Sequence, residues 1–132
     1  MALPKTLEQG RASHAFAYAD VKVSNNMKDK FKSHVKSFPM LVKTNGLGAA
    51  IAFLFSKGDK ESGVYKLVAE SIVKWLKKEE KYKYYGLERL DDLKSLTDDI
   101  TQLNSSNYRA LTIEILAYFT WLRRFAEGLS NE

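Results

Sequence analysis

Residues 106–128 read SNYRALTIEILAYFTWLRRFAEG, and this stretch decides the fold. Its main apolar residues recur at the spacing of one helical face: Tyr108, Leu111, Ile115, Phe119, Leu122, Phe125 and Leu129. Ile113, Leu116 and Ala117 add apolar surface on other faces. Such a helix must be covered by its neighbours, because it is apolar around much of its circumference. The stretch therefore predicts a long, largely buried C-terminal helix in an all-α fold.

The rest of the chain reads as further helices. Apolar residues recur at helical spacing in five segments, over about residues 6–23, 27–43, 47–56, 62–78 and 87–103. Pro39 either kinks the second segment or opens a separate short helix, and the fifth segment either continues through Ser95 or breaks there. The third segment is almost wholly apolar and is expected to be buried. No segment alternates as a strand would. The prediction is a single domain over residues 1–132, a compact bundle of five to six helices.

Two helix starts carry capping signals. Thr6 and Gln9 have the spacing of a capping box, in which each side chain bonds to the other residue's backbone N–H. The last helix is expected to begin at one of three capping residues: Ser105, Ser106 or Asn107. Thr44, Asn45 and Gly46 form a strong stop after the second segment.

Composition narrows the class of protein. The 132 residues are enough for one domain with its own core. Because the chain has no cysteine, it can form neither a disulfide framework nor a thiolate zinc site. The N-terminal residues lack the apolar core of a signal peptide. The longest apolar run, residues 46–55, is about half the ~20 residues that span a bilayer. A soluble, cytoplasmic protein is expected.

The charge balance favours an anionic partner. Lysine and arginine number 21 against 16 aspartates and glutamates, a net charge of +5, which suits RNA, DNA or an acidic protein surface. A stripe on the second segment holds Lys28, Lys32, Lys36 and Lys43. A tyrosine-rich connector holds Lys74, Lys77, Lys78, Lys81 and Lys83 beside Tyr82, Tyr84 and Tyr85. The last helix carries Arg109, Arg123 and Arg124.

Each basic cluster also has a purely structural interpretation. A lysine stripe opposite an apolar face is the ordinary way to solvate a helix. Tyr84 and Tyr85 can cover the core, and arginines near a helix C-terminus complement its dipole. Against this, lysines beside exposed tyrosines can combine phosphate contacts with base stacking. Three basic clusters on one small domain favour RNA binding without sequence-specific readout.

Catalytic candidates are few. His14 is interpreted as a packed or half-exposed helical residue, and His34 as a hydrogen-bonded core histidine on the apolar stripe of its helix. Four aspartates could suggest a magnesium site: Asp91, Asp92, Asp98 and Asp99. Adjacent helical residues point about 100° apart, so neither pair converges on one ion, and a solvated acidic face is the favoured interpretation. The sequence predicts no catalytic residue, no metal site and no cofactor.

Two segments resemble one known family. Residues 43–54, KTNGLGAAIAFL, are similar to the NGL…(A)AFL motif of the small subunit of type III-B CRISPR effectors, the Cmr complex. Residues 108–112, YRALT, and residues 121–128, WLRRFAEG, resemble that family's C-terminal helix. The order and spacing of the two motifs, the chain length, the helical layout and the basic balance agree with the family.

The resemblance implies an all-α, non-enzymatic structural protein. In that family several copies stack beside the backbone subunits of a ribonucleoprotein and line the groove where guide RNA and target RNA pair. The implied partners are other Cmr subunits, further copies of the chain, guide RNA and target RNA, with no membrane and no small-molecule substrate. The residues expected to contact RNA phosphates are Lys32, Lys36, Lys43, Arg109, Arg123 and Arg124.

Two other functions compete with this one. A helical protein–protein adaptor would use the same basic surface against an acidic partner and would not touch nucleic acid. A helical ribonuclease or metal-dependent hydrolase would use the four aspartates, and the geometric argument above disfavours it.

Overall fold

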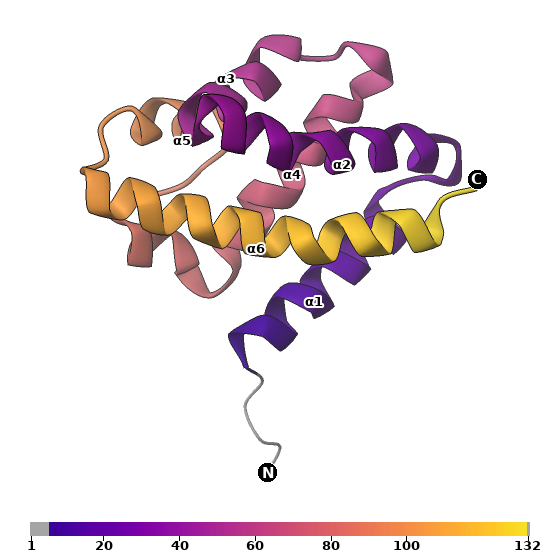
Figure 1. Ribbon diagram of the computed structural model, residues 1–132, viewed down its shortest axis with the longest axis horizontal. Helices are drawn as coiled ribbons and strands as arrows, with labels where there is room; N and C mark the ends of the chain where they lie inside the picture. Colours follow the sequence, from indigo (N-terminus) through magenta and orange to yellow (C-terminus); the bar gives the residue numbers. More distant parts are fainter. Residues whose placement is uncertain (1–5, 132) are drawn as a thin grey trace.

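Six α-helices and four short helices make up the structure, a computed structural model that describes residues 6–131. The α-helices are α1 (Leu7–Ala17), α2 (Lys28–Asn45), α3 (Leu47–Lys57), α4 (Val64–Lys77), α5 (Leu93–Ile100) and α6 (Ser105–Leu129). The short helices are the π-helix η1 (Tyr18–Lys22) and three 3₁₀ segments, η2 (Asn25–Met27), η3 (Glu61–Gly63) and η4 (Lys78–Tyr85). No strand occurs in residues 6–131. The all-α prediction, with six helices and a long C-terminal one, is confirmed (Figure 1).

Helix α6 lies along the middle of the molecule, with α2 antiparallel to it and α1 packed against it (Figure 1). Its inward face holds Leu111, Glu114, Ile115, Tyr118, Phe119, Leu122 and Ala126. Phe38 of α2 packs on Phe119, with ring centroids 4.8 Å apart, and Trp75 of α4 stacks on Tyr118 at 5.4 Å. Burying each large apolar side chain of this kind stabilises the fold by about 1.5–3 kcal/mol.

The ends of α6 differ slightly from the prediction. Asn104, not one of the three residues after it, caps the start, because its Oδ1 accepts a hydrogen bond from the backbone N–H of Asn107 at 2.8 Å. Within α6, Ile113 points to solvent. None of the helices in residues 6–131 has both the length and the apolar character needed to cross a lipid bilayer.

The capping box at the start of α1 is confirmed. The Thr6 hydroxyl accepts from the N–H of Gln9 at 3.1 Å, and the Gln9 side chain accepts from the N–H of Thr6 at 2.9 Å. Pro39 lies inside α2 without ending it. Of the two outcomes left open by the sequence, a separate short helix does not occur.

The two motif segments meet in space. Gly46 ends α2 with φ at +92°, a conformation that L side chains rarely adopt. The Tyr108 hydroxyl accepts a hydrogen bond from the Gly48 N–H at 2.8 Å, and a Cβ on Gly46 would lie 3.3 Å from the same oxygen. The glycines of the NGLG motif therefore terminate a helix and admit the tyrosine that opens the second motif.

Two predicted elements are wrong in detail. Helix α5 begins at Leu93 and not near residue 87, because the Asp92 carboxylate accepts from the Ser95 N–H at 2.9 Å and caps the helix there. Ser95 thus belongs to a capping box and does not break a helix. Helix α3 is only half buried, because Phe53 and Phe55 are exposed.

Candidate nucleic-acid interface

A groove of about 410 Å³ runs between α2 and α6, and we call it the basic α2–α6 groove. Lys43 lines it from α2, and Arg123 and Arg124 line it from α6. Pro39 and Phe119 contribute apolar wall. The antiparallel packing of the two helices thus gathers three of the six predicted RNA-contacting residues from distant parts of the sequence.

The positive charges of this groove are only partly neutralised. Arg123 Nε lies 3.3 Å from Glu127 Oε1, and Arg124 Nη1 lies 3.8 Å from Glu127 Oε2. One carboxylate therefore serves two guanidinium groups. Lys43 is exposed and forms no ion pair with any residue from 6 to 131. Because exposed ion pairs contribute little free energy, a phosphate group can compete with Glu127 for the arginines.

The other three predicted residues lie outside the groove. Lys36 is exposed on α2, about 10 Å along the helix from Lys43 at 1.5 Å per residue. Lys32 is half buried one turn further from Lys43. Arg109 is exposed on nearly the same face of α6 as Arg123, but about 21 Å away along the axis.

Lys28 does not belong to the exposed stripe in which the sequence placed it. Its side chain is buried, and its Nζ donates hydrogen bonds to the carbonyls of Ala19, Asp20 and Val23 at 2.9, 3.1 and 3.0 Å. These carbonyls come from η1 and the residue after it. Lys28 therefore stabilises a helix terminus and is not available to RNA.

Most lysines of the tyrosine-rich connector are engaged within the protein. Lys81 is buried and sits over the Trp75 ring, with Nζ 4.3 Å from the centroid. Lys74 pairs with Glu70 at 2.9 Å, and Lys83 pairs with Glu80. These contacts differ from the solvated basic cluster that composition alone suggested.

The two histidines have structural partners. His14 Nδ1 lies 2.7 Å from the Tyr118 hydroxyl oxygen, and burial, helped by nearby lysines, lowers the pKa of His14 to about 4. The packed position predicted for His14 is confirmed. His34 is not in the core, because it is half exposed, with Nε2 2.8 Å from Glu61 Oε2 and its ring against Tyr65.

The aspartates do not assemble into a metal site. Arg89 pairs with Asp91 at 2.6 Å, and Asp92 caps α5. In the part of the chain that the structure describes, no three acidic, histidine or cysteine side chains are placed to hold an ion.

Glu114 is the charged residue that sequence reasoning missed. It lies on the inner face of α6 with a side chain 3% exposed, and it accepts four hydrogen bonds. Arg11 of α1 donates two, from Nε and Nη2, each at 2.7 Å. Trp75 Nε1 of α4 and the Tyr85 hydroxyl of η4 donate the others, each at 3.0 Å. A lone acidic residue among the apolar positions of a buried helix was the available signal, because such a charge needs a partner.

The electrostatics of this network favour the ionised pair. Burial by itself raises the pKa of Glu114, but the hydrogen bonds from Arg11 and Trp75 outweigh it, so its pKa lies below the usual value. The hydrogen bond to Glu114 raises the pKa of Arg11, and burial is the main cause that raises the pKa of Tyr85. We call these four side chains the Glu114 network, which joins α1, α4, η4 and α6.

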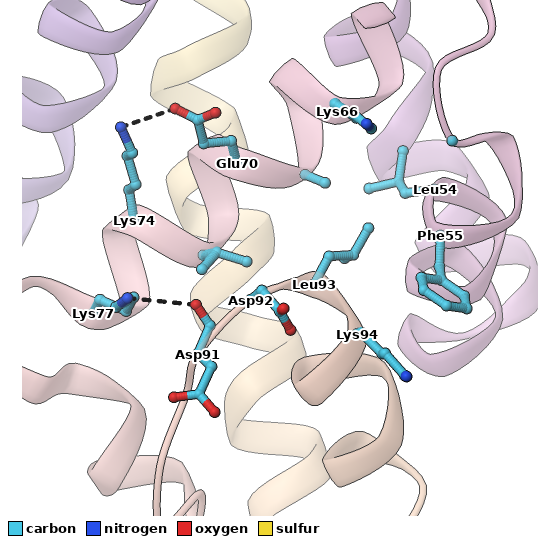
Figure 2. A pocket seen from close by; sticks show the side chains of 13 residues that line it. Leu54, Phe55, Lys66, Glu70, Lys74, Lys77, Asp91, Asp92, Leu93 and Lys94 are labelled. Atoms are coloured by element: carbon cyan, nitrogen blue, oxygen red, sulfur yellow. Dashed lines mark hydrogen bonds and ion pairs between the residues drawn. The ribbon is translucent and has the colours of Figure 1, made fainter.

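A larger groove, of about 690 Å³, lies between α3, α4 and α5 (Figure 2). Leu54, Phe55 and Leu93 give it an apolar lining. Around them, lysines and carboxylates alternate: Lys74 pairs with Glu70, and the Lys77 Nζ donates to the Asp91 carbonyl at 3.4 Å. This balanced rim does not match an RNA backbone as the basic α2–α6 groove does.

Comparison with known proteins places this architecture. Residues 7–129 match the family described as CRISPR-associated protein (Cas_Cmr5). This chain belongs to the Cmr5 family. The match covers both motif segments and almost the whole described chain, so the resemblance predicted from the sequence is confirmed.

Two proteins of Thermus thermophilus illustrate the relationship. The chain is 27% identical over 128 residues to a protein named CRISPR system Cmr subunit Cmr5, and the aligned region covers 97% of this chain and 99% of the relative. The crystal structure of a CRISPR-associated Cmr5 family protein superimposes with a TM-score of 0.76. The two chains are 23% identical, and the match covers 96% of this chain and 100% of that one. The Cmr5 fold is therefore shared.

Proposed function

We propose that this chain is a non-catalytic structural subunit of a type III-B CRISPR ribonucleoprotein, the Cmr complex, and that it contacts guide or target RNA through the basic α2–α6 groove. The observation that carries the proposal is the meeting of Lys43, Arg123 and Arg124 in one groove of a Cmr5 family member. This role places the chain in the cytoplasm.

The chemistry of the groove suits phosphate contacts without base readout. Arginine can bind two phosphate oxygens with its planar fork, and lysine supplies a mobile point charge. Such contacts fix the position of a nucleic acid and carry no sequence information. A complex whose specificity comes from guide pairing requires nothing more of this subunit.

A non-catalytic role is supported by the state of the groups that could do chemistry. His14 is buried against Tyr118, His34 pairs with Glu61, and Asp92 caps a helix. Each of these side chains already has a structural partner.

Several copies are expected to stack along the complex. Identical subunits that stack head to tail use two different complementary surfaces, because a two-fold contact would close after two copies. The exposed phenylalanines of α3 and the protruding α1 lie toward opposite ends of the molecule and offer apolar surface for such contacts (Figure 1).

Charge reversal in the groove tests the proposal. In the assembled Cmr complex, Lys43→Glu combined with Arg124→Glu is expected to weaken binding of target RNA at least about tenfold, because two attractive contacts become repulsive. The matched control is Lys60→Glu combined with Lys94→Glu, two exposed lysines outside the groove. Equal RNA affinity of the groove variant and the wild type, in a complex of unchanged composition, would contradict the proposal.

The adaptor function makes a different prediction for the same variant. Glu127 already sits against both arginines, so an acidic peptide could occupy the groove. In that case the groove variant would lose a protein partner, and the loss would persist in samples stripped of RNA by ribonuclease.

A further inference from the structure

We propose that a second groove, between the start of α1 and η4, binds an unpaired nucleotide of a single-stranded nucleic acid, with the base stacked on Tyr84 and the phosphate held by Lys78. This groove has a volume of about 510 Å³, within the range of small-ligand sites. It shares no residue with the basic α2–α6 groove, so the inference does not depend on RNA contacts there.

Tyr84 is the aromatic residue on which this site is built. It lines the groove and is 78% exposed, the largest exposure among the apolar and aromatic side chains recorded as exposed in residues 6–131. Its neighbour Tyr85 is partly buried and uses its hydroxyl to hold Glu114. Tyr84 has no comparable structural task. An exposed aromatic ring beside lysines is the combination with which proteins hold unpaired bases.

The backbone next to Tyr84 is strained. Glu79 and Glu80 are consecutive residues with φ of +54° and +53°, the left-handed region that non-glycine residues adopt at a cost in free energy. The reversal returns Lys81 over the Trp75 ring, where its Nζ donates to the Lys78 carbonyl at 3.2 Å. The fold therefore maintains an unfavourable turn whose result is the basic, aromatic wall of this groove.

The same turn leaves Lys78 available. The carboxylates of Glu79 and Glu80 pair with Lys81, at 3.7 Å, and with Lys83. Lys78 lines the groove, is exposed and forms no ion pair with any residue that the structure describes. Its ammonium group is the natural partner for the phosphate that follows a base stacked on Tyr84.

The local potential is positive despite the two glutamates. After burial, the main causes that lower the pKa of His14 are the charges of Lys78, Lys81 and Lys74. The lysines thus disfavour a further cation at this end of α1, and the same field favours an anion.

The floor of the groove is preformed. Gly10 lets α1 approach the Trp75 indole closely, since a Cβ at this position would lie 3.5 Å from Trp75 Cη2. Leu7 adds apolar lining on the α1 side. A base entering between Leu7 and Tyr84 would meet apolar and aromatic surface that needs no rearrangement of the helices.

The test uses the full chain and a fluorescently labelled oligouridylate, with a duplex RNA of matched length as the comparison. Tyr84→Ala is expected to weaken binding of the single strand about tenfold and to leave duplex binding unchanged, because only an unpaired base can stack. Tyr84→Phe keeps the ring and is expected to bind like the wild type. Lys78→Ala should weaken binding and flatten the log–log salt dependence by about 0.7, the loss of one phosphate contact. Lys60→Ala, which removes one exposed charge elsewhere, is the control.

The outcomes separate this inference from the proposed function. Wild-type affinity of Tyr84→Ala for the single strand, an equal loss for duplex RNA, or no binding of the oligouridylate by the wild type at low salt would each overturn the inference. The Lys43→Glu and Arg124→Glu variant tests the other groove independently. If that variant alone loses RNA, the proposed function stands and the Tyr84 site is rejected.

Discussion

The chain places arginine beside glutamate in two regions with opposite consequences. In the Glu114 network, one guanidinium faces one buried carboxylate, and two further donors complete the coordination. In the basic α2–α6 groove, two guanidinium groups share the half-buried Glu127, and Arg124 is 75% exposed. The first region is complete in itself and stabilises the fold. The second has unsatisfied positive charge at the surface and can take a ligand.

The largest expected effect of breaking this comparison lies in the buried region. Glu114→Ala leaves the Arg11 guanidinium without its carboxylate and the Trp75 and Tyr85 donors without an acceptor. We expect a loss of about 3–5 kcal/mol in the free energy of unfolding, the usual cost of removing one member of a buried ion pair. Urea denaturation measures it.

The control for that variant is Glu127→Ala, which removes the corresponding carboxylate at the surface. Its effect on the free energy of unfolding should stay below about 1 kcal/mol. Similar losses for the two variants would show that the Glu114 network contributes no more than a surface pair.

A second, intermediate effect concerns the pH dependence of stability. The pKa of His14 is lowered from 6.5 to about 4 in the folded protein, first by burial. Between these values the unfolded chain binds a proton that the folded chain does not, so stability falls as the pH is lowered through this range. Allowing for the partial exposure of the ring, we expect a loss of roughly 1–2 kcal/mol.

His14→Gln tests this effect because it removes the titrating group and keeps a polar partner for Tyr118. Unfolding measured at several pH values should show a smaller decline below pH 6.5, the ordinary pKa of histidine, than in the wild type. A decline of the same size would assign the pH dependence to other groups.

The smallest expected effect is a gain in affinity at the surface. Glu127→Ala frees Arg123 and Arg124 from their shared carboxylate, so RNA binding should strengthen a few-fold and its salt dependence should steepen, since more charge meets phosphate. Fluorescence anisotropy over a range of salt concentrations measures both. Weaker binding by this variant would mean that Glu127 holds the arginines in their binding geometry.

Local sequence signals predicted most of the fold correctly. The spacing of Leu111, Ile115 and Leu122 identified the central helix, and Thr6 with Gln9 gave the start of α1. These features depend on contacts between residues a few positions apart. The start of α5 was missed because the capping strength of Asp92 was not weighed against the leucine spacing that continues upstream.

Contacts between distant segments explain what the sequence could not predict. Lys28 belongs to a lysine stripe by spacing, but its ammonium group reaches three carbonyls of η1 and the residue after it. Glu114 and Arg11 lie 103 residues apart and meet only when α1 packs on α6. The three cations of the basic α2–α6 groove were all proposed from the sequence, but only the antiparallel packing of two helices brings them into one groove.

The most direct test of the central claim is RNA–protein photocrosslinking in the assembled Cmr complex, with the adducts on this chain mapped by mass spectrometry. The account predicts adducts on peptides that contain Lys43, Arg123 and Arg124, and their loss in the Lys43→Glu and Arg124→Glu variant. A complex that contains guide and target RNA but yields no adduct at the basic α2–α6 groove would contradict it.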